Sequence, residues 1–423
     1  MVWEILQGHA VDLLKAMPNN SVHCVVTSPP YWGLRSYKTE PQVWGGEAGH
    51  EHGWGETSIR TQSPQRDASG GVGGGKVYGS RGEQPGNSGR AFKSDTDRFC
   101  SCSAWRGELG SEPTPELYVK HIVDVFREVR RVLRDDGVMF LNLGDSYWGG
   151  KGQSGHSSPE YQAARVAAGK SLSSPAAHVG GPGRMRPSDG HHPILKPKDL
   201  VGIPWRVALA LQADGWYLRS DIIWAKPNPI PESVTDRPTK SHEYLFLLTK
   251  SPRYFFDQEA VREDYKNAKI NSSKRPITGF RSTPPGSKNH SALGKPQSEF
   301  YKNTGRNLRT VWTITTQPYK EAHFATYPEK LVEPCIKAGT STKGCCAACG
   351  APRKRIANPP KTTGWSPTCS CQDDTIPCTV LDPFCGSGTT GAVAVKLGRF
   401  FVGLELQPAY IELSHRRIGL AEK

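Results

Sequence analysis

The sequence LDPFCGSGTT, residues 381–390, decides the fold class. The residues Thr379–Leu381 predict a strand, the glycines predict a tight turn, and Thr389–Leu397 predict a helix. In this arrangement the backbone of the turn can approach a ligand at the helix N-terminus. The next predicted strand, Phe400–Leu404, is followed by Glu405, at a position where an acidic side chain commonly binds ribose hydroxyls. The stretch therefore predicts a ligand at the carboxyl edge of a parallel sheet.

The alternation of strand and helix continues outside this stretch. β-Branched or apolar runs predict further strands at 22–27, 138–143, 217–224 and 244–248. Apolar residues at helical spacing predict helices at 116–134, 200–212 and 408–418. Asp135-Asp136-Gly137 is expected to end the first of these helices. Together the elements predict an α/β fold with a doubly wound, mostly parallel, Rossmann-like sheet.

A second motif, Thr27-Ser28-Pro29-Pro30-Tyr31-Trp32, also follows a predicted strand. Its two prolines restrict the backbone, so the carbonyl groups beside them are held in place. An acceptor pair next to an aromatic ring suits the exocyclic amino group of a nucleobase. Taken alone, the motif is also compatible with an ordinary turn. Likewise, Gly386-x-Gly388-x-x-Gly391 also fits the dinucleotide-binding fingerprint.

Together the two motifs resemble those of amino-group DNA methyltransferases, which transfer a methyl group from S-adenosylmethionine to N4 of cytosine or N6 of adenine. The catalytic motif precedes the cofactor motif, as in the permuted β group of that family. The resemblance implies catalytic roles for Ser28, Pro29, Pro30 and Tyr31. It implies cofactor-binding roles for residues of the HFATYP segment (323–328) and of the glycine loop: Phe324, Thr326, Tyr327, Pro328, Asp382, Phe384, Gly386, Gly388, Thr389 and Glu405.

The identity of the first catalytic residue bears on the target base. Serine, as at Ser28, is commoner in the family's cytosine-N4 members, so the resemblance favours cytosine N4 in double-stranded DNA, with adenine N6 as the alternative. Two remoter alternatives are an NAD-dependent oxidoreductase, from the glycine pattern, and a non-catalytic zinc-ribbon DNA-binding protein, from the cysteines. Amino-group methylation needs no cysteine nucleophile, so Pro334-Cys335 and Pro377-Cys378 are interpreted as structural.

Composition and charge indicate the partner. The 423 residues carry a net charge of +14, and 36% are hydrophobic, with 45 Gly and 34 Pro. This composition indicates a folded core interrupted by long polar loops. A net charge of +9 falls between Lys266 and Arg309, where the resembling family places its target-recognition region. Basic side chains there are expected to contact DNA phosphates: Lys266, Lys269, Lys274, Arg275, Arg281, Lys288, Lys295, Lys302, Arg306 and Arg309.

Two sets of side chains have the spacing of metal ligands. Cys346-x-x-Cys349 followed by Cys369-x-Cys371 resembles the two knuckles of a zinc ribbon, in which four thiolates leave no open position on the ion. Gly350 permits the tight turn that such a knuckle needs. His50, His52, Cys100 and Cys102 form a second candidate set for a structural Zn²⁺, and they flank a polar insertion.

The motifs divide the chain into parts. We expect a catalytic half at 1–48 and 106–231, target recognition at 232–310, a cofactor half at 311–343 and 376–423, and a zinc ribbon at 344–372. Gly-rich insertions cover 55–98 and 149–193. Neither a bilayer-spanning run nor a signal peptide is apparent. We therefore expect a cytoplasmic, nucleoid-associated enzyme of a prokaryote or its phage, with a cognate restriction endonuclease as a candidate partner and no membrane partner.

Overall fold

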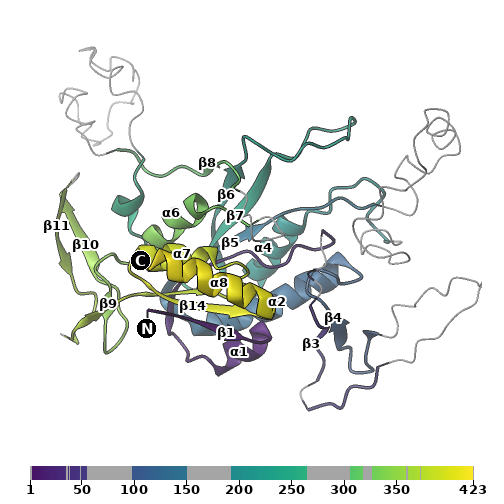
Figure 1. Cartoon of the computed structure of the whole chain (residues 1–423), viewed down its shortest axis with the longest axis horizontal. Coiled ribbons are helices and arrows are strands. Elements are labelled where there is room, and N and C mark those ends of the chain that lie inside the picture. The colour runs from purple at the N-terminus through teal and green to yellow at the C-terminus, as the bar shows by residue number, and fades with distance from the viewer. Residues whose placement is uncertain are drawn as a thin grey trace, which may run out of the picture.

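The computed structural model describes residues 2–34, 37, 39–47, 49–54, 98–149, 192–263, 305–317, 326–358, 361–371 and 373–422. Within these residues, eight strands form one sheet in the order β1-β14-β13-β2-β5-β7-β6-β8 (Figure 1). Their bounds are β1 Trp3–Gln7, β2 Val22–Thr27, β5 Leu133–Leu143, β6 Tyr217–Ala225, β7 His242–Thr249, β8 Val311–Thr313, β13 Thr379–Asp382 and β14 Phe400–Glu405. Only β7 pairs antiparallel with its neighbours. The predicted mostly parallel α/β sheet is confirmed.

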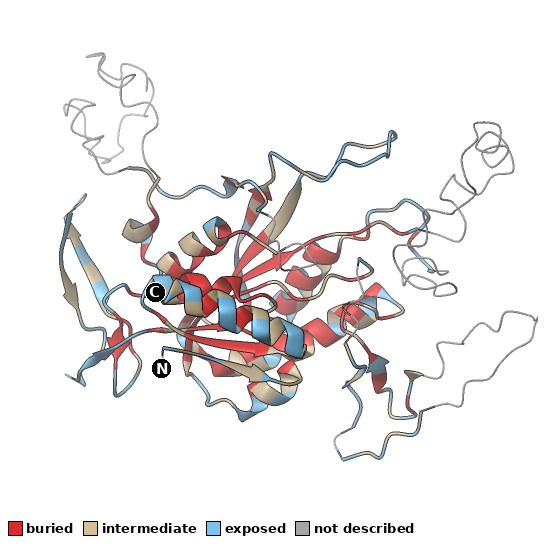
Figure 2. Ribbon diagram, viewed as in Figure 1, coloured by how far each residue is buried: buried red, intermediate tan, exposed pale blue. Residues whose placement is uncertain are grey.

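Helices cover both faces of this sheet. Helices α1 (Ala10–Ala16), α2 (Pro115–Val132) and α4 (Ile203–Ala213) contribute to one apolar core, and α6 (Glu329–Gly339), α7 (Thr389–Lys396) and α8 (Pro408–Ala421) contribute to the other. Strand β2 explains the arrangement, because Val25 enters the first core while Cys24 and Val26 enter the second. Figure 2 accordingly shows buried residues along the central strands and the inner faces of the helices.

The two motifs meet in the middle of the sheet. Strand β13 pairs in parallel with β2, with Val380 opposite Cys24 and Leu381 opposite Val25. The loops that follow the two strands therefore emerge at the same edge. Strand order changes direction here, and such switch points are where α/β sheets bind their ligands.

The start of β5 differs from the sequence-based expectation. Helix α2 ends at Val132, and β5 begins at once with Leu133. Pairing with β2 then shifts from Val22–Leu133 to Cys24–Val138. The strand thus begins at Leu133 rather than at the expected 138, and Asp135-Asp136-Gly137 form a bulge within it, just after the helix that they were expected to end.

Short two-stranded ribbons lie outside the sheet. Strand β3 (Gln42–Trp44) pairs with β4 (Trp105–Gly107), β9 (Cys345–Cys346) with β12 (Thr375–Ile376), and β10 (Lys354–Asn358) with β11 (Lys361–Ser366). A 3-10 turn, η4, covers Gln258–Val261. Strand β7 falls inside the range 232–310 expected for target recognition, yet it lies in the sheet between β5 and β6. In the described part of the chain, no helix has the length and apolar character to cross a membrane.

Candidate active site and cofactor pocket

The loop after β13 is shaped by glycine. Gly386 and Gly388 have φ values of +53° and +77°, a left-handed backbone that favours glycine. A Cβ on Gly388 would lie 3.0 Å from Ser414, so this glycine also allows α8 to pack closely. Gly388 is the N-cap of α7, and the positive end of that helix dipole therefore lies at the loop.

A pocket opens beside this loop and contains Phe384 and Glu405 of the predicted site. Both oxygens of Glu405 accept backbone N–H groups, from Gly386 and Gln407, each at 2.8 Å. Burial raises the pKa of the Glu405 carboxyl. Each carboxylate oxygen can accept a second hydrogen bond, so Glu405 remains able to hold a ribose hydroxyl. The rest of the lining is Gly8, His9, Ala10, Thr39, Gln42, Trp44, Leu109, Pro383, Leu404 and Leu406.

Asp382 lies fully buried beneath the pocket and joins the two motifs. Its Oδ1 accepts from Thr27 Oγ1 at 2.7 Å and from the backbone N–H of Phe384 at 3.1 Å. Its Oδ2 accepts from Thr390 Oγ1 at 2.8 Å and from the Tyr327 hydroxyl at 2.9 Å. Burial raises the pKa of Asp382, while these four donors favour its charged form. Asp382 thus connects the catalytic strand, the cofactor loop and the segment before α6.

The remaining predicted cofactor residues have distinct positions. Tyr327 is held by Asp382, and Pro328 is the N-cap of α6. Thr389 accepts a hydrogen bond from Arg417 Nη1 at 2.7 Å, so its side chain bonds to α8. Thr326 is half-buried just before Tyr327, and Phe324 lies outside the described residues.

The loop after β2 has its aromatic side chain fixed by hydrogen bonds. The Tyr31 hydroxyl lies 2.9 Å from both Asn142 Oδ1 and Glu243 Oε2, and it accepts from Ser28 Oγ at 3.1 Å. Burial raises the pKa of Tyr31 well above its usual range, so the hydroxyl stays protonated at neutral pH. A Cβ on Gly144 would lie 2.5 Å from the Tyr31 ring, which shows how closely the backbone there approaches it.

The carbonyl groups of this loop differ in the hydrogen bonds that they accept. The Tyr118 hydroxyl donates to the Pro30 carbonyl at 2.9 Å, which leaves that oxygen with a structural role. In the described part of the chain, no such donor reaches the carbonyl oxygen of Ser28 or of Pro29. Trp32 is buried and donates from Nε1 to the carbonyl of Glu112 at 2.9 Å. The loop is therefore anchored on both sides of the predicted acceptors.

Two charged residues at this site were missed by sequence analysis. Glu243 contacts Tyr31 and forms an ion pair with Lys226, at the ends of β7 and β6. Lys226 follows the predicted strand 217–224, and this carboxyl end, where sheet ligands bind, was the available signal. Glu243 precedes the predicted strand 244–248 and gave no such signal, because it reaches this edge only through the antiparallel direction of β7. Asp145, also at this edge, accepts from the backbone N–H groups of Gly202 and Ile203 at 3.0 Å and so stabilises the start of α4.

Three clusters of metal-ligand side chains occur among the described residues. The four sulfur atoms of Cys346, Cys349, Cys369 and Cys371 lie within 4.8 Å of one another. Gly350 has a φ of +70°, as expected for a knuckle turn. His50, His52, Cys100 and Cys102 also converge within 4.8 Å, as does a third group of His23, Cys345 and Cys378. Both predicted metal sets are therefore brought together.

The predicted DNA-binding residues fall mostly outside the described chain. Arg306 and Arg309 are described, and both form ion pairs with Glu263, at 2.7 and 3.0 Å. Glu263 and Arg306 also exchange backbone hydrogen bonds, which closes the base of the segment 264–304. Lys266, Lys269, Lys274, Arg275, Arg281, Lys288, Lys295 and Lys302 lie outside the described residues.

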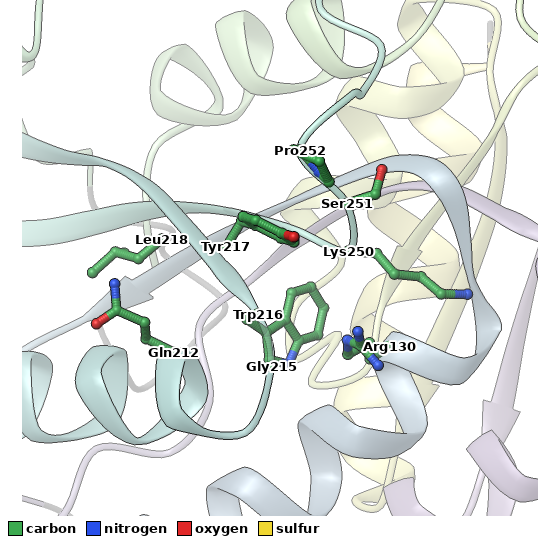
Figure 3. Close-up of a pocket in the computed structure, with 9 residues that line it drawn as sticks. All are labelled: Arg130, Gln212, Gly215, Trp216, Tyr217, Leu218, Lys250, Ser251 and Pro252. Atoms are coloured by element: carbon green, nitrogen blue, oxygen red, sulfur yellow. The ribbon is translucent and has the colours of Figure 1, made fainter.

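Another pocket lies at the opposite edge of the sheet (Figure 3). It lies where β6 begins and β7 ends, and Lys250 Nζ donates to the carbonyl of Leu133 at the start of β5. Figure 3 shows Arg130 and Lys250 on the same side of this pocket. Its lining residues, Arg130, Gln212, Gly215, Trp216, Tyr217, Leu218, Lys250, Ser251 and Pro252, include no predicted site residue.

Comparison with known proteins agrees with this geometry. The family described as DNA methylase, which comprises N6 and N4 methyltransferases, matches residues 22–416. The type II methyltransferase M.Cfr9I of Citrobacter freundii is 33% identical over 414 residues, covering 98% of this chain and 87% of that protein. M.SmaI of Serratia marcescens is 32% identical over 415 residues, covering 98% and 90%. The solved PvuII DNA methyltransferase (cytosine-N4-specific) is 15% identical, with a TM-score of 0.47 and coverage of 99% and 86%.

The chain belongs to the amino-group DNA methyltransferases. It therefore uses S-adenosylmethionine as methyl donor and DNA as substrate. This membership overturns the two remote alternatives, an NAD-dependent oxidoreductase and a non-catalytic zinc-ribbon protein. The residues around the pocket fit the cofactor, since they provide an aromatic ring at Phe384, an acceptor at Glu405 and close backbone at Gly386.

Proposed function

We propose that this methyltransferase modifies N4 of cytosine in double-stranded DNA. The observation that carries the proposal is Ser28 at the first catalytic position, with its Oγ directed to the Tyr31 hydroxyl at 3.1 Å. Serine at this position is commoner among the cytosine-N4 members that the motif resembles. Adenine N6 is the second candidate, because the same acceptors fit either amino group.

The proposed chemistry is a direct displacement, for which the enzyme supplies alignment and polarisation. When bound, S-adenosylmethionine supplies an activated methyl group on its sulfonium. Ser28 Oγ and the Pro29 carbonyl accept the N–H groups of the base, and the nitrogen lone pair thereby becomes available for attack. Tyr31 stacks on the base after it leaves the duplex, because the target atom is not accessible within the stack. Glu243 and Asn142 hold the Tyr31 ring in place.

We propose that target recognition begins after strand β7, at residue 264, rather than at 232. The supporting observation is that β7 (His242–Thr249) is paired on both sides within the sheet. The eight basic residues between Lys266 and Lys302 are then the phosphate-binding candidates. Arg306 and Arg309 instead anchor this segment through Glu263.

Analysis of the modified base tests the proposed target. The full-length protein is incubated with S-adenosylmethionine and unmethylated bacterial DNA, and the digested nucleosides are identified by mass spectrometry. N4-methylcytosine is the expected product, and N6-methyladenine alone would contradict the proposal. Methylation-sensitive sequencing of the same DNA gives the recognition sequence.

We propose a restriction-modification role in the cytoplasm of a prokaryotic host, where the DNA substrate lies. The type II names of the similar proteins support this role. DNA methylated by this enzyme should resist one endonuclease from the same genome. If every endonuclease from that genome cut methylated and unmethylated DNA equally, the role would be wrong.

We also propose that Cys346, Cys349, Cys369 and Cys371 bind a structural Zn²⁺, because four convergent thiolates form a closed tetrahedral site. Cys349→Ser should remove one equivalent of zinc and lower the melting temperature by about 5 °C or more, since metal binding stabilises the folded state. Ser370→Ala is the matched control, because Ser370 lies between two of the ligands and is exposed. Equal zinc content in Cys349→Ser and the parent would contradict the proposal.

A further inference from the structure

The second cluster of ligand side chains belongs to the ribbon β3–β4. His50 and His52 follow β3, and Cys100 and Cys102 precede β4. His50 Nε2 lies 3.3 Å from Cys100 Sγ, and His52 Nδ1 lies 3.4 Å from Cys102 Sγ. Zinc bonds of about 2.0–2.1 Å to nitrogen and 2.3 Å to sulfur place such atoms roughly 3.6 Å apart in a tetrahedron. The four atoms are therefore arranged nearly as a Cys₂His₂ zinc ion requires.

The third cluster shows that proximity alone does not make a metal site. His23 Nδ1 accepts the backbone N–H of Thr379 at 3.0 Å, and its Nε2 is bonded to the Gly350 carbonyl at 2.8 Å. Neither ring nitrogen is available to a metal ion. In the ribbon cluster, by contrast, one nitrogen of each histidine faces a thiol.

The ribbon also forms part of the cofactor pocket. Gln42 and Trp44 of β3 line that pocket together with Phe384 and Glu405. Trp44 packs edge-on against His9, another lining residue, with ring centroids 4.5 Å apart. A change in the position of β3 would therefore move one wall of the pocket relative to the glycine loop.

Aromatic packing attaches the ribbon to α2. Trp44 and Trp105 are paired across the two strands. Both stack on His121 of α2, with centroid distances of 5.6 and 5.5 Å. His121 in turn contacts the buried Glu112 at 3.0 Å, which connects this assembly to the loop that supports Trp32.

The chain beyond the Trp44–Trp105 pair, where the ligands lie, needs a separate constraint. Each strand has only three residues, and an isolated two-stranded ribbon is marginally stable in water. The strands are joined through the long segment 55–97, so closing the ribbon costs loop entropy. The backbone of Gly46 (φ +85°) packs against the ligands, since a Cβ there would lie 2.7 Å from Ala104 Cβ and 3.0 Å from Cys102 Sγ.

We propose that a Zn²⁺ ion bound by His50, His52, Cys100 and Cys102 fixes the ribbon as the outer wall of the cofactor pocket. Occupancy of this ion then sets the affinity for S-adenosylmethionine. The inference rests on the cofactor-binding function but not on the choice between cytosine and adenine. It differs from the role of the four-cysteine site, whose residues do not line this pocket.

The test compares Cys102→Ser with Ser101→Ala in the full-length protein. Ser101 is exposed and lies between the two cysteine ligands. Zinc is measured by elemental analysis after dialysis, and S-adenosylmethionine affinity is measured by calorimetry without DNA. Cys102→Ser should lose one equivalent of zinc and bind the cofactor at least tenfold more weakly, about 1.4 kcal/mol. Ser101→Ala should match the parent in both measurements.

A metal-exchange experiment covers the case in which Cys102→Ser fails to fold. Cys349→Ser retains only the site formed by His50, His52, Cys100 and Cys102. This variant is stripped of metal with a chelator and then reloaded with Zn²⁺. The affinity for S-adenosylmethionine should fall when the metal is removed and recover when Zn²⁺ is restored. Loading with Co²⁺ instead should give the absorption spectrum of an ion bound by two thiolates and two imidazoles. Zinc retained by Cys102→Ser, or zinc loss without a change in affinity, would overturn the inference. A parent protein with intact zinc that binds no S-adenosylmethionine would instead contradict the cofactor function itself.

Discussion

Tyr31→Ala is expected to lower the rate of methyl transfer by about 10²-fold while changing S-adenosylmethionine affinity by less than about twofold. Base–aromatic stacking contributes roughly 1–3 kcal/mol to binding of the base. Loss of the ring also removes the hydroxyl that accepts a hydrogen bond from Ser28 Oγ. Tyr31 does not line the described cofactor pocket, so cofactor binding should persist. Single-turnover kinetics and calorimetry measure the two quantities.

Tyr31→Phe separates the ring from the hydroxyl. It retains the stacking surface but removes the contacts to Asn142 and Glu243, so we expect a smaller loss of about three- to tenfold. If Phe reduced the rate as much as Ala, the hydroxyl rather than the ring would carry the effect. Full activity in Tyr31→Ala would show that stacking has no role.

Asp382→Ala is expected to lower the free energy of unfolding by about 3–5 kcal/mol and to weaken cofactor binding at least tenfold. The substitution removes the acceptor of four donors, of which Thr390 Oγ1 can still donate to the Val26 carbonyl and the Tyr327 hydroxyl to Thr390. The other two have no alternative acceptor among the described residues, and buried unsatisfied groups each cost about 1–3 kcal/mol. The four donors are on Thr27, Phe384, Thr390 and Tyr327, so the loss reaches both motifs. Urea unfolding and calorimetry measure the two effects.

Two variants serve as controls for Asp382→Ala. Asp382→Asn keeps one carbonyl oxygen and should be affected less than Asp382→Ala. Asp135→Ala removes an exposed carboxylate paired with Lys250 at 2.9 Å, and surface pairs contribute at most about 1 kcal/mol. If Asp382→Ala were no less stable than Asp135→Ala, the proposed linking role of Asp382 would be wrong.

The sequence was sufficient to predict the elements that surround the two motifs. Runs such as Val22–Thr27 and Phe400–Leu404 are short and apolar, and a proline lies within four residues of the end of each, so strand and edge could both be inferred. The bulge at Asp135-Asp136-Gly137 could not be inferred, because the same residues are typical of a turn. It depends on pairing with β2, in which the four residues 134–137 of β5 lie opposite the single residue His23.

Site residues that lie close to one another in the sequence were predictable, whereas those brought together only by the packing of strands and segments were not. Cys346 and Cys349 are separated by two residues, so a knuckle could be recognised before their sulfurs were seen to converge. Glu243 reaches Tyr31 only because β7 runs antiparallel beside β5. Arg306 and Arg309 were assigned to DNA, yet Glu263 pairs with both across a segment of more than forty residues.

The Thr27–Asp382 hydrogen bond has a consequence for synthesis in the cell. Its partners are 355 residues apart, so at about 5–20 residues per second the second arrives roughly 20–70 s after the first. During that time β2 can pair with β5 on one side only, and an unpaired strand edge promotes aggregation. The nascent chain therefore has to protect the unpaired edge of β2 until β13 has been synthesised. The catalytic loop cannot reach its active arrangement before translation is nearly finished.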